Sequence, residues 1–204
     1  MPRVSKKQVE KNREAIKNKA STLFRERGFD GVGIPEITRA AGLTQGSFYG
    51  HFESKDALVS EASDAAFEVG FERWARHRAH EKSLAQARTE FIRQYLTVLN
   101  RDKPGEAGPI ATLVGDVARL PPDAPVRKVF AERIAQVLGT LWPVFPGEGN
   151  DESTEQEALA SLSAIVGAML LSRATAGTHL SEKFLKAVSA SLTGNPPGPA
   201  PEND

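Results

Sequence analysis

A short stretch of the chain, residues 42–55, concentrates side chains that can donate and accept hydrogen bonds. It reads GLTQGSFYGHFESK and ends in a lysine. Its candidate polar groups belong to Thr44, Gln45, Ser47, Tyr49 and His51. Hydroxyl, amide and imidazole groups of this kind bind the polar edges of bases and the oxygens of phosphates. The stretch therefore predicts a surface that recognises its partner through hydrogen bonds.

The apolar residues of the same stretch indicate how this surface is held. Phe48 and Phe52 are four residues apart, so they share one face of a helix. The side chains expected beneath them are Leu23, Phe24 and Ile37. A helix of about seven residues is only ~10 Å long and is not stable alone, so its aromatic face must anchor it. The opposite face is then free to enter a major groove of DNA.

The residues before this stretch predict two further helices. An apolar stripe with a period of 3.6 residues predicts the first, which ends at Gly28. A short second helix is expected over residues 34–41, with Pro35 in its first turn, where the missing N–H costs nothing. Gly42 lies in the following turn, where a positive φ is easiest for glycine. Three helices joined in this way form a helix-turn-helix arrangement.

The third helix, which begins at Thr44, is the one expected to read DNA. The amide of Gln45 can hydrogen-bond base edges, and the hydroxyls of Thr44 and Ser47 can reach bases or phosphate. Gly46 lets the backbone approach the groove closely. The remaining contacts are expected to go to phosphates, from Tyr49, His51 and Lys55.

Charge is distributed unevenly along the chain. The formal net charge is zero at pH 7, yet residues 1–60 hold 11 lysines and arginines against 7 acidic residues, and residues 61–204 hold 15 against 19. A local excess of positive charge is what contact with phosphates requires. Chance clustering produces the same pattern, so charge alone leaves both explanations open.

The segment over residues 28–58, GFDGVGIPEITRAAGLTQGSFYGHFESKDAL, resembles the signature of TetR/AcrR-family transcriptional regulators. The resemblance covers residues 9–60 and implies a DNA-binding domain whose third helix, residues 44–51, reads an operator. It places the family's usual contacts on the polar positions named above, and on Gly46 and Lys55. It also implies that Arg13, at a frequent basic position of the first helix, touches phosphate.

Two residues depart from the family's pattern. Gly33 stands where a threonine or serine often caps the second helix, so a hydroxyl cap is missing there. Thr38 replaces a common alanine. Neither change threatens the fold, but the phosphate contacts on that side of the domain lose support.

The rest of the chain also shows the helical period, with breaks at clusters of glycine and proline. We expect an all-α fold of about nine helices, one of them over residues 83–101. The expected domains are a helix-turn-helix domain over residues 1–53, a C-terminal helical domain over residues 54–193 and a disordered tail over residues 194–204. The family resemblance implies that the C-terminal domain binds a ligand and forms a dimer.

The helix expected over residues 154–175 is rich in small side chains, which lets another helix come close. With the last helix it predicts a four-helix bundle across a two-fold axis of a homodimer. Burial within one monomer explains the same pattern equally well. The residues assigned to the interface are Leu159, Leu162, Val166, Met169, Leu170, Arg173, Phe184 and Val188.

Six aromatic residues are candidates to line a pocket for a small-molecule effector whose identity the sequence does not reveal. They are Phe67, Phe71, Trp74, Phe91, Tyr95 and Trp142. Aromatic side chains at helical spacing are more often ordinary core, so each of them has this second explanation.

Several classes of function find no support in the sequence. The chain has no cysteine, which excludes disulfides and thiol chemistry and fits a cytoplasmic protein. No signal peptide or membrane-spanning run is expected, and therefore no membrane partner. Nucleophile elbow, Walker loop and HExxH motif are all missing, so we expect no catalytic residues, no metal and no cofactor.

Together these features predict a homodimeric repressor that leaves a palindromic operator on double-stranded DNA when an effector binds. A ligand-independent activator or architectural DNA-binding protein is the main alternative. A helical enzyme is a third.

Overall fold

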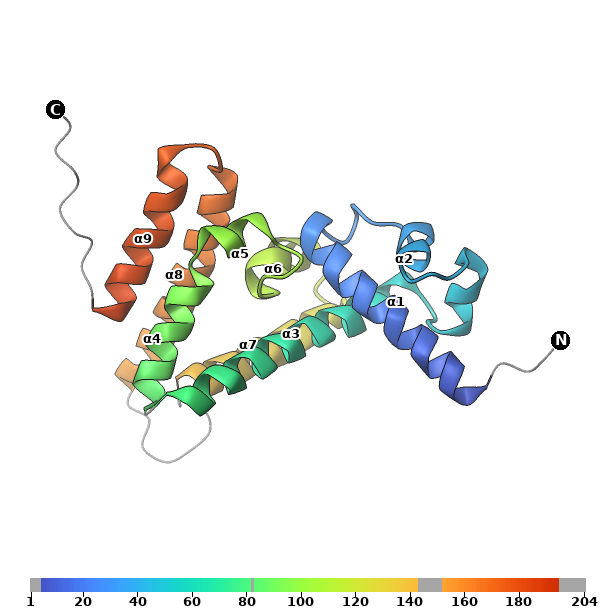
Figure 1. The fold of residues 1–204 in the computed structure, drawn as a ribbon, viewed down its shortest axis with the longest axis horizontal. Coiled ribbons are helices and arrows are strands. Elements are labelled where there is room, and N and C mark those ends of the chain that lie inside the picture. Colours follow the sequence, from blue (N-terminus) through green and yellow to red (C-terminus); the bar gives the residue numbers. More distant parts are fainter. Residues whose placement is uncertain (1–4, 82, 143–151, 195–204) are drawn as a thin grey trace. The chain divides into compact units, whose positions relative to one another are not determined.

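The computed structural model describes residues 5–81, 83–142 and 152–194. Across these residues it has nine α-helices, one 3₁₀-helix and no strand, which confirms the expected all-α fold (Figure 1). Contacts divide the chain into two compact units, Met1–Gly70 with Pro104–Arg133, and Phe71–Lys103 with Ile134–Asp204. The first unit therefore extends past residue 53, where the sequence suggested a domain boundary.

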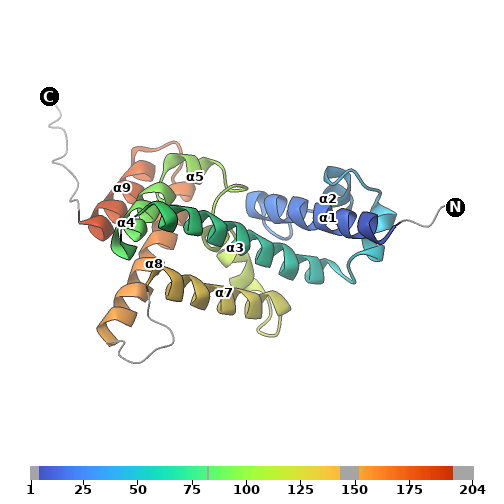
Figure 2. The same cartoon turned by 60° about the horizontal axis from the view of Figure 1, so that its bottom comes forward.

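The first unit begins with α1, Lys6–Arg27, followed by α2, Ile34–Ala40, and the 3₁₀-helix η1, Gln45–Gly50. Ser5 caps α1 by accepting a hydrogen bond from the backbone N–H of Gln8, which satisfies a donor that has no partner within the helix. α1 and α2 lie side by side in Figures 1 and 2.

The later helices of this unit extend its core. They are the first part of α3, Lys55–His80, then α6, Ile110–Arg119, and the first part of α7, Pro125–Leu141. Ile16, Phe24, Ile37, Phe48 and Leu58 are all fully buried. The rings of Phe67 and Phe130 meet edge to face, with centroids 5.2 Å apart, and join α3 to α7.

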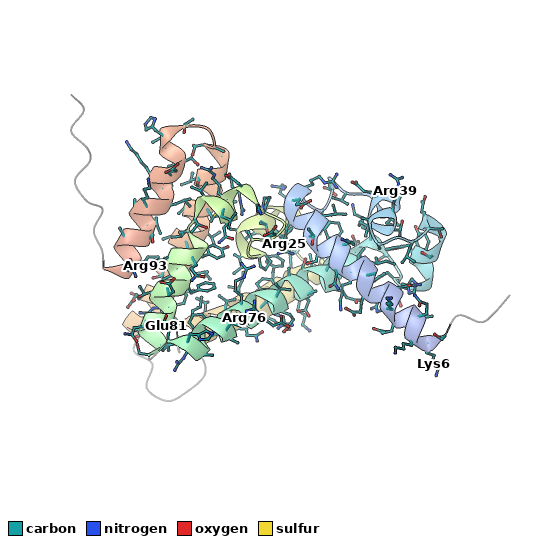
Figure 3. The ribbon with its side chains drawn as sticks, viewed as in Figure 1. Lys6, Arg25, Arg39, Arg76, Glu81 and Arg93 are labelled. Atoms are coloured by element: carbon teal, nitrogen blue, oxygen red, sulfur yellow. The ribbon has the colours of Figure 1, made fainter. Side chains whose placement is uncertain are left out.

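The end of α1 is held against the segment that leads into α6. Arg25 donates a 2.8 Å hydrogen bond to the carbonyl of Ala107 (Figure 3). Gly28 ends α1 with a φ of +75°, as the glycine signal predicted. A Cβ at Gly28 would lie 2.8 Å from a carboxylate oxygen of Asp116 in α6, but this side chain can move aside, so the positive φ is the main reason why the position favours glycine.

The second unit contains α4, Leu84–Tyr95, α5, Val98–Asp102, α8, Glu152–Ala174, and α9, His179–Thr193. The prediction of one helix over residues 83–101 is wrong, because the chain breaks after Tyr95. Thr97 accepts a hydrogen bond from the N–H of Asn100 and caps a new short helix, which competes with continuation of α4. α9 ends at Gly194, with a φ of +71°, and the rest of the expected tail lies outside the described residues.

Candidate nucleic-acid interface

The turn between α2 and η1 is built as the glycine pattern predicted. Gly42 has a φ of +73°. Its N–H donates to the carbonyl of Arg39 at 3.0 Å, and the N–H of Leu43 donates to the carbonyl of Thr38 at 2.8 Å. These bonds satisfy the last carbonyls of α2 and turn the chain sharply toward η1.

The element expected to read DNA is η1, a 3₁₀-helix over Gln45–Gly50, and not the α-helix expected over residues 44–51. Thr44 occupies the N-cap position, but its side chain makes no capping bond. The hydroxyl of Ser47 donates instead to the carbonyl of Thr44 at 2.6 Å. A six-residue element of this kind closes with the tighter i→i+3 bonds, which suit short helices.

One side of η1 is anchored by aromatic rings, as expected. Phe48 and Phe52 are buried, and their rings stack with centroids 5.7 Å apart. Phe24 and Ile37 beneath them are fully buried, while Leu23 is only half-buried. Because η1 is too short to be stable alone, this packing fixes where its other side points.

The other side of η1 presents the polar residues that the sequence singled out. Thr44, Gln45, Gly46 and Tyr49 are exposed, and 68% of Tyr49 is accessible to solvent. The Tyr49 and Phe48 rings meet edge to face with centroids 5.2 Å apart, a contact that restrains the exposed Tyr49 side chain.

Ser47, His51 and Lys55 are only partly exposed. His51 Nδ1 is buried and has no hydrogen-bond partner within the described part of the chain. With Nδ1 buried, Nε2 is the ring nitrogen left for a contact with a partner. Lys55 is the first residue of α3, directly after the segment that follows η1.

The side chain of Arg13, which was expected to touch phosphate, is bound to other residues of the protein. Its Nη1 donates to the carbonyl of His51 at 2.8 Å, and its Nη2 lies 2.6 Å from both carboxylate oxygens of Glu61. Sequence reasoning missed Glu61, since nothing in the spacing of the two residues pairs them across 48 positions.

The two residues that depart from the family pattern are accommodated without strain. Gly33 is the N-cap residue of α2 and supplies no side-chain bond. Thr38 is fully buried, and its hydroxyl donates to the carbonyls of Ile34 and Pro35 at 3.0 and 3.2 Å. A further exposed cation, Arg39, reaches outward from the last turn of α2 (Figure 3). A basic residue just before the turn was the sequence signal for it.

The residues expected at a dimer interface do not all face outward. Leu159 and Leu170 are 46% and 41% exposed, and Leu171, which was not predicted, is 47% exposed. Met169 is fully buried inside the monomer, so its assignment to an interface is wrong. The partly buried residues are Leu162, Val166, Phe184 and Val188.

The side chain of Arg173 is also hydrogen-bonded within its own unit. Its Nη2 donates to the carbonyl of Asn100 at 3.0 Å, and its Nε donates to the carbonyl of Arg101 at 3.3 Å. Burial lowers the pKa of Arg173 from its ordinary value. The side chain therefore ties α8 to α5, which the spacing along α8 did not indicate.

The helix α8 also meets a membrane criterion. Its residues Thr154–Ala174 are long and apolar enough to cross a membrane, by length and composition alone, and 33% of that window is buried. The core helix of a soluble protein passes the same test, so this finding is weak support for a membrane span. The exposed leucines on α8 account for the same composition.

The six aromatic residues proposed for an effector pocket are divided between the two units. Phe67 belongs to the first unit, and the other five to the second. There the Trp74 and Phe91 rings meet edge to face at 5.6 Å, and Phe91 stacks on Tyr95 at 5.9 Å.

Two hollows among the described residues have other linings. One of about 260 Å³ is lined by Asp56, Val59 and residues 120–121 and 123–126, and one of about 290 Å³ lies over the exposed side of α4. Neither includes any of the six aromatics. Their part in an effector pocket stays a prediction.

Two short helices joined by a glycine turn, with a polar outer face on the second, define a helix-turn-helix protein. Residues 16–62 match the family model described as "Bacterial regulatory proteins, tetR family". This match covers the segment that contains the glycine turn and η1.

Two curated relatives match over part of the chain. The HTH-type transcriptional repressor DhaR of Mycobacterium sp. (strain GP1) is 47% identical over 55 residues, which cover 27% of this chain and 28% of DhaR. The HTH-type transcriptional regulator AcrR of Shigella flexneri is 38% identical over 61 residues, or 30% of this chain and 28% of AcrR. The chain thus matches less than a third of the length of either relative.

The likeness in fold extends much further along the chain. The crystal structure of the reduced form of NemR from E. coli has a TM-score of 0.72 and 20% sequence identity, and the match covers 90% of this chain and 95% of that one. At this level of identity the likeness shows the fold.

Proposed function

We propose that the protein is a sequence-specific DNA-binding transcriptional regulator that acts as a repressor at a palindromic operator. The observation that carries this proposal is that η1 has one buried apolar side and one exposed polar side. Phe48 and Phe52 bury one side, and the opposite side exposes hydrogen-bonding groups. The match of residues 16–62 to the TetR family and the repressor named among the relatives support it.

In this proposal each exposed group of the recognition element has a definite role. The amide of Gln45 reads a base edge, and a bidentate contact to adenine is the pairing that its geometry favours. Thr44 and Ser47 contact bases or phosphate, and Gly46 permits close approach. Tyr49, His51 Nε2 and Lys55 bind phosphates and set the register of the protein on the duplex.

A second copy of the chain supplies the second recognition element. The exposed leucines of α8, Leu159, Leu170 and Leu171, are candidates for the contact between copies. In such a dimer the two elements read half-sites about 34–36 Å apart. Release by a small-molecule effector completes the proposal, because a small change in that separation abolishes the fit to both half-sites at once.

The test compares binding to DNA from upstream of the protein's own gene with binding to random DNA, at a fixed salt concentration of about 150 mM. We expect a protected palindrome bound about 10³-fold more tightly than random sequence. Equal affinity for both DNAs, repeated with genomic fragments selected by the protein itself, would refute specific recognition.

Matched tyrosine variants assign the contact to η1. Tyr49→Ala should lower operator affinity through the loss of a phosphate contact, whereas Tyr95→Ala, which changes the other tyrosine of the chain in the second unit, should retain it. A Tyr49→Ala protein with the operator affinity of the wild type would remove Tyr49 from the interface.

The dimer and the direction of control need separate measurements. Leu170→Lys should convert the dimer to a monomer in sedimentation velocity and lower operator affinity, while Leu99→Lys, at another exposed leucine, should leave the dimer intact. A reporter gene placed behind the operator should be silenced by the protein; stimulated expression would instead favour an activator.

A further inference from the structure

The side chain of Arg13 joins three separate parts of the first unit. From α1 it donates to the carbonyl of His51, 38 residues away, and binds both carboxylate oxygens of Glu61 on α3. Its guanidinium carbon lies 4.3 Å from the centre of the Phe52 ring. One side chain therefore links α1 and α3 to the segment that directly follows η1.

The carbonyl that Arg13 binds lies at the C-terminal end of η1. His51 is the C-cap residue of η1, where the last carbonyls of a helix lack partners within the helix. Its own N–H donates back to the carbonyl of Phe48 at 2.9 Å, so the His51 peptide continues the backbone of η1. An arginine that donates to this carbonyl stabilises the helix end and limits how far it can rotate.

The Phe52 ring gives Arg13 a second hold on the same element. Phe52 stacks on Phe48, the residue that anchors η1 from below. A guanidinium group over an aromatic face is attracted by the negative charge of that face. Arg13 thus restrains η1 through its terminal carbonyl and through its aromatic anchor together.

These contacts hold the Arg13 guanidinium within the first unit through Nη1 and Nη2. Both carboxylate oxygens of Glu61 lie 2.6 Å from Nη2, a charge-assisted contact. A phosphate that drew Nη1 and Nη2 away would leave the carboxylate unpaired and the His51 carbonyl without its donor. The negative charge of Glu61 also neutralises Arg13 locally, which weakens its attraction for DNA.

We propose that Arg13 is a positioning residue, which orients the recognition element through His51 and Glu61 and makes no phosphate contact. This inference rests on the proposed DNA-binding function. It assigns Glu61, a negatively charged residue that would otherwise oppose DNA binding, a positive part in operator affinity.

The experiment measures affinity for the operator and for random DNA between about 50 and about 200 mM salt, in the wild type and three variants. Arg13→Lys keeps the charge but loses the planar fork, so it cannot bind the carboxylate and the carbonyl together. Glu61→Gln removes the partner charge. Lys55→Gln is the control for a residue proposed to contact phosphate.

If Arg13 positions η1, Arg13→Lys and Glu61→Gln should each weaken operator binding by about tenfold or more, with little change on random DNA. The slope of log affinity against log salt should stay as in the wild type. Lys55→Gln should lower the magnitude of that slope by about 0.9 for each lost contact. The double variant of Arg13 and Glu61 should be no weaker than the worse single variant, since both act through one cluster.

If Arg13 contacts phosphate, the two variants should affect operator affinity differently. Arg13→Lys would then bind almost as well as the wild type, because lysine also binds phosphate, and Glu61→Gln would bind more tightly. Either result would overturn the inference while the operator preference of the wild type stood. A wild type without operator preference would instead refute the proposed function itself.

Circular dichroism at the assay temperature checks that each variant is folded. Should Arg13→Lys not fold, Glu61→Gln decides alone, because the sign of its effect on operator affinity differs between the two roles.

Discussion

Replacing Phe48 by alanine should detach the recognition element from the first unit. Phe48 is fully buried, and its ring contacts Tyr49 and Phe52 at centroid distances of 5.2 and 5.7 Å. Truncation of a buried phenylalanine costs about 3–5 kcal/mol, and each aromatic pair contributes about 0.5–1.5 kcal/mol beyond its buried area. With two pairs lost, we expect a loss near 5 kcal/mol, about the whole stability of a marginal domain.

Urea unfolding followed by circular dichroism measures this loss, and operator binding is measured alongside it. Tyr49→Ala is the matched control, because Tyr49 is 68% exposed and gives up only one of the two ring pairs. It should cost about 1 kcal/mol or less in stability and yet lower operator affinity. The two neighbours should therefore separate folding from binding.

The reasoning fails if Phe48→Ala costs less than about 1 kcal/mol, the size expected for a position that is not part of a packed core. Such a result would mean that η1 is held by its backbone bonds and not by its aromatic side.

Three further predictions concern stability. Gly28→Ala should lower the free energy of unfolding by about 1–2 kcal/mol, since the φ of +75° disfavours a side chain; an unchanged urea midpoint would contradict this. Ser63→Ala should raise that free energy by about 1 kcal/mol, because the buried hydroxyl has no partner within the described residues; a lower melting temperature would mean that the hydroxyl is in fact bonded. The hydrogen bond from Arg101 lowers the pKa of Asp102 below its ordinary 3.8, so its stabilisation is present above that pH and disappears as pH falls through the lowered pKa. Urea midpoints from pH about 7 down to about 2 should fall less steeply in Asp102→Asn than in the wild type.

Much of the DNA-binding element could be predicted because its signals are local. The positive φ at Gly42 and the burial of Phe48 and Phe52 both follow from residue type and short-range spacing. Glycine tolerates a positive φ wherever it stands, and residues four apart share a helical face in any fold. The type of η1 was harder, because the choice between i→i+3 and i→i+4 bonds depends on how the element packs.

At the helix break after Tyr95, the apolar periodicity of the sequence predicted the wrong structure. Apolar spacing continued from α4 to Leu99, yet the chain ends the helix and begins another with Thr97 as its cap. Leu99 is then exposed and not in line with the buried side of α4. A capping side chain and tertiary packing together outweighed the periodicity.

The sequence by itself determined the all-helical fold, the glycine turn and the aromatic anchor of η1, because each depends on neighbouring residues. Only the tertiary structure decided that Arg13 is bound to Glu61, that Met169 is buried and that Leu171 is exposed. Ion pairs and burial join residues many positions apart, and no spacing along the chain encodes which groups meet. Residue type therefore identifies candidate contacts to DNA or to a second copy. Only the folded structure shows whether such a side chain is exposed or is bound within the protein.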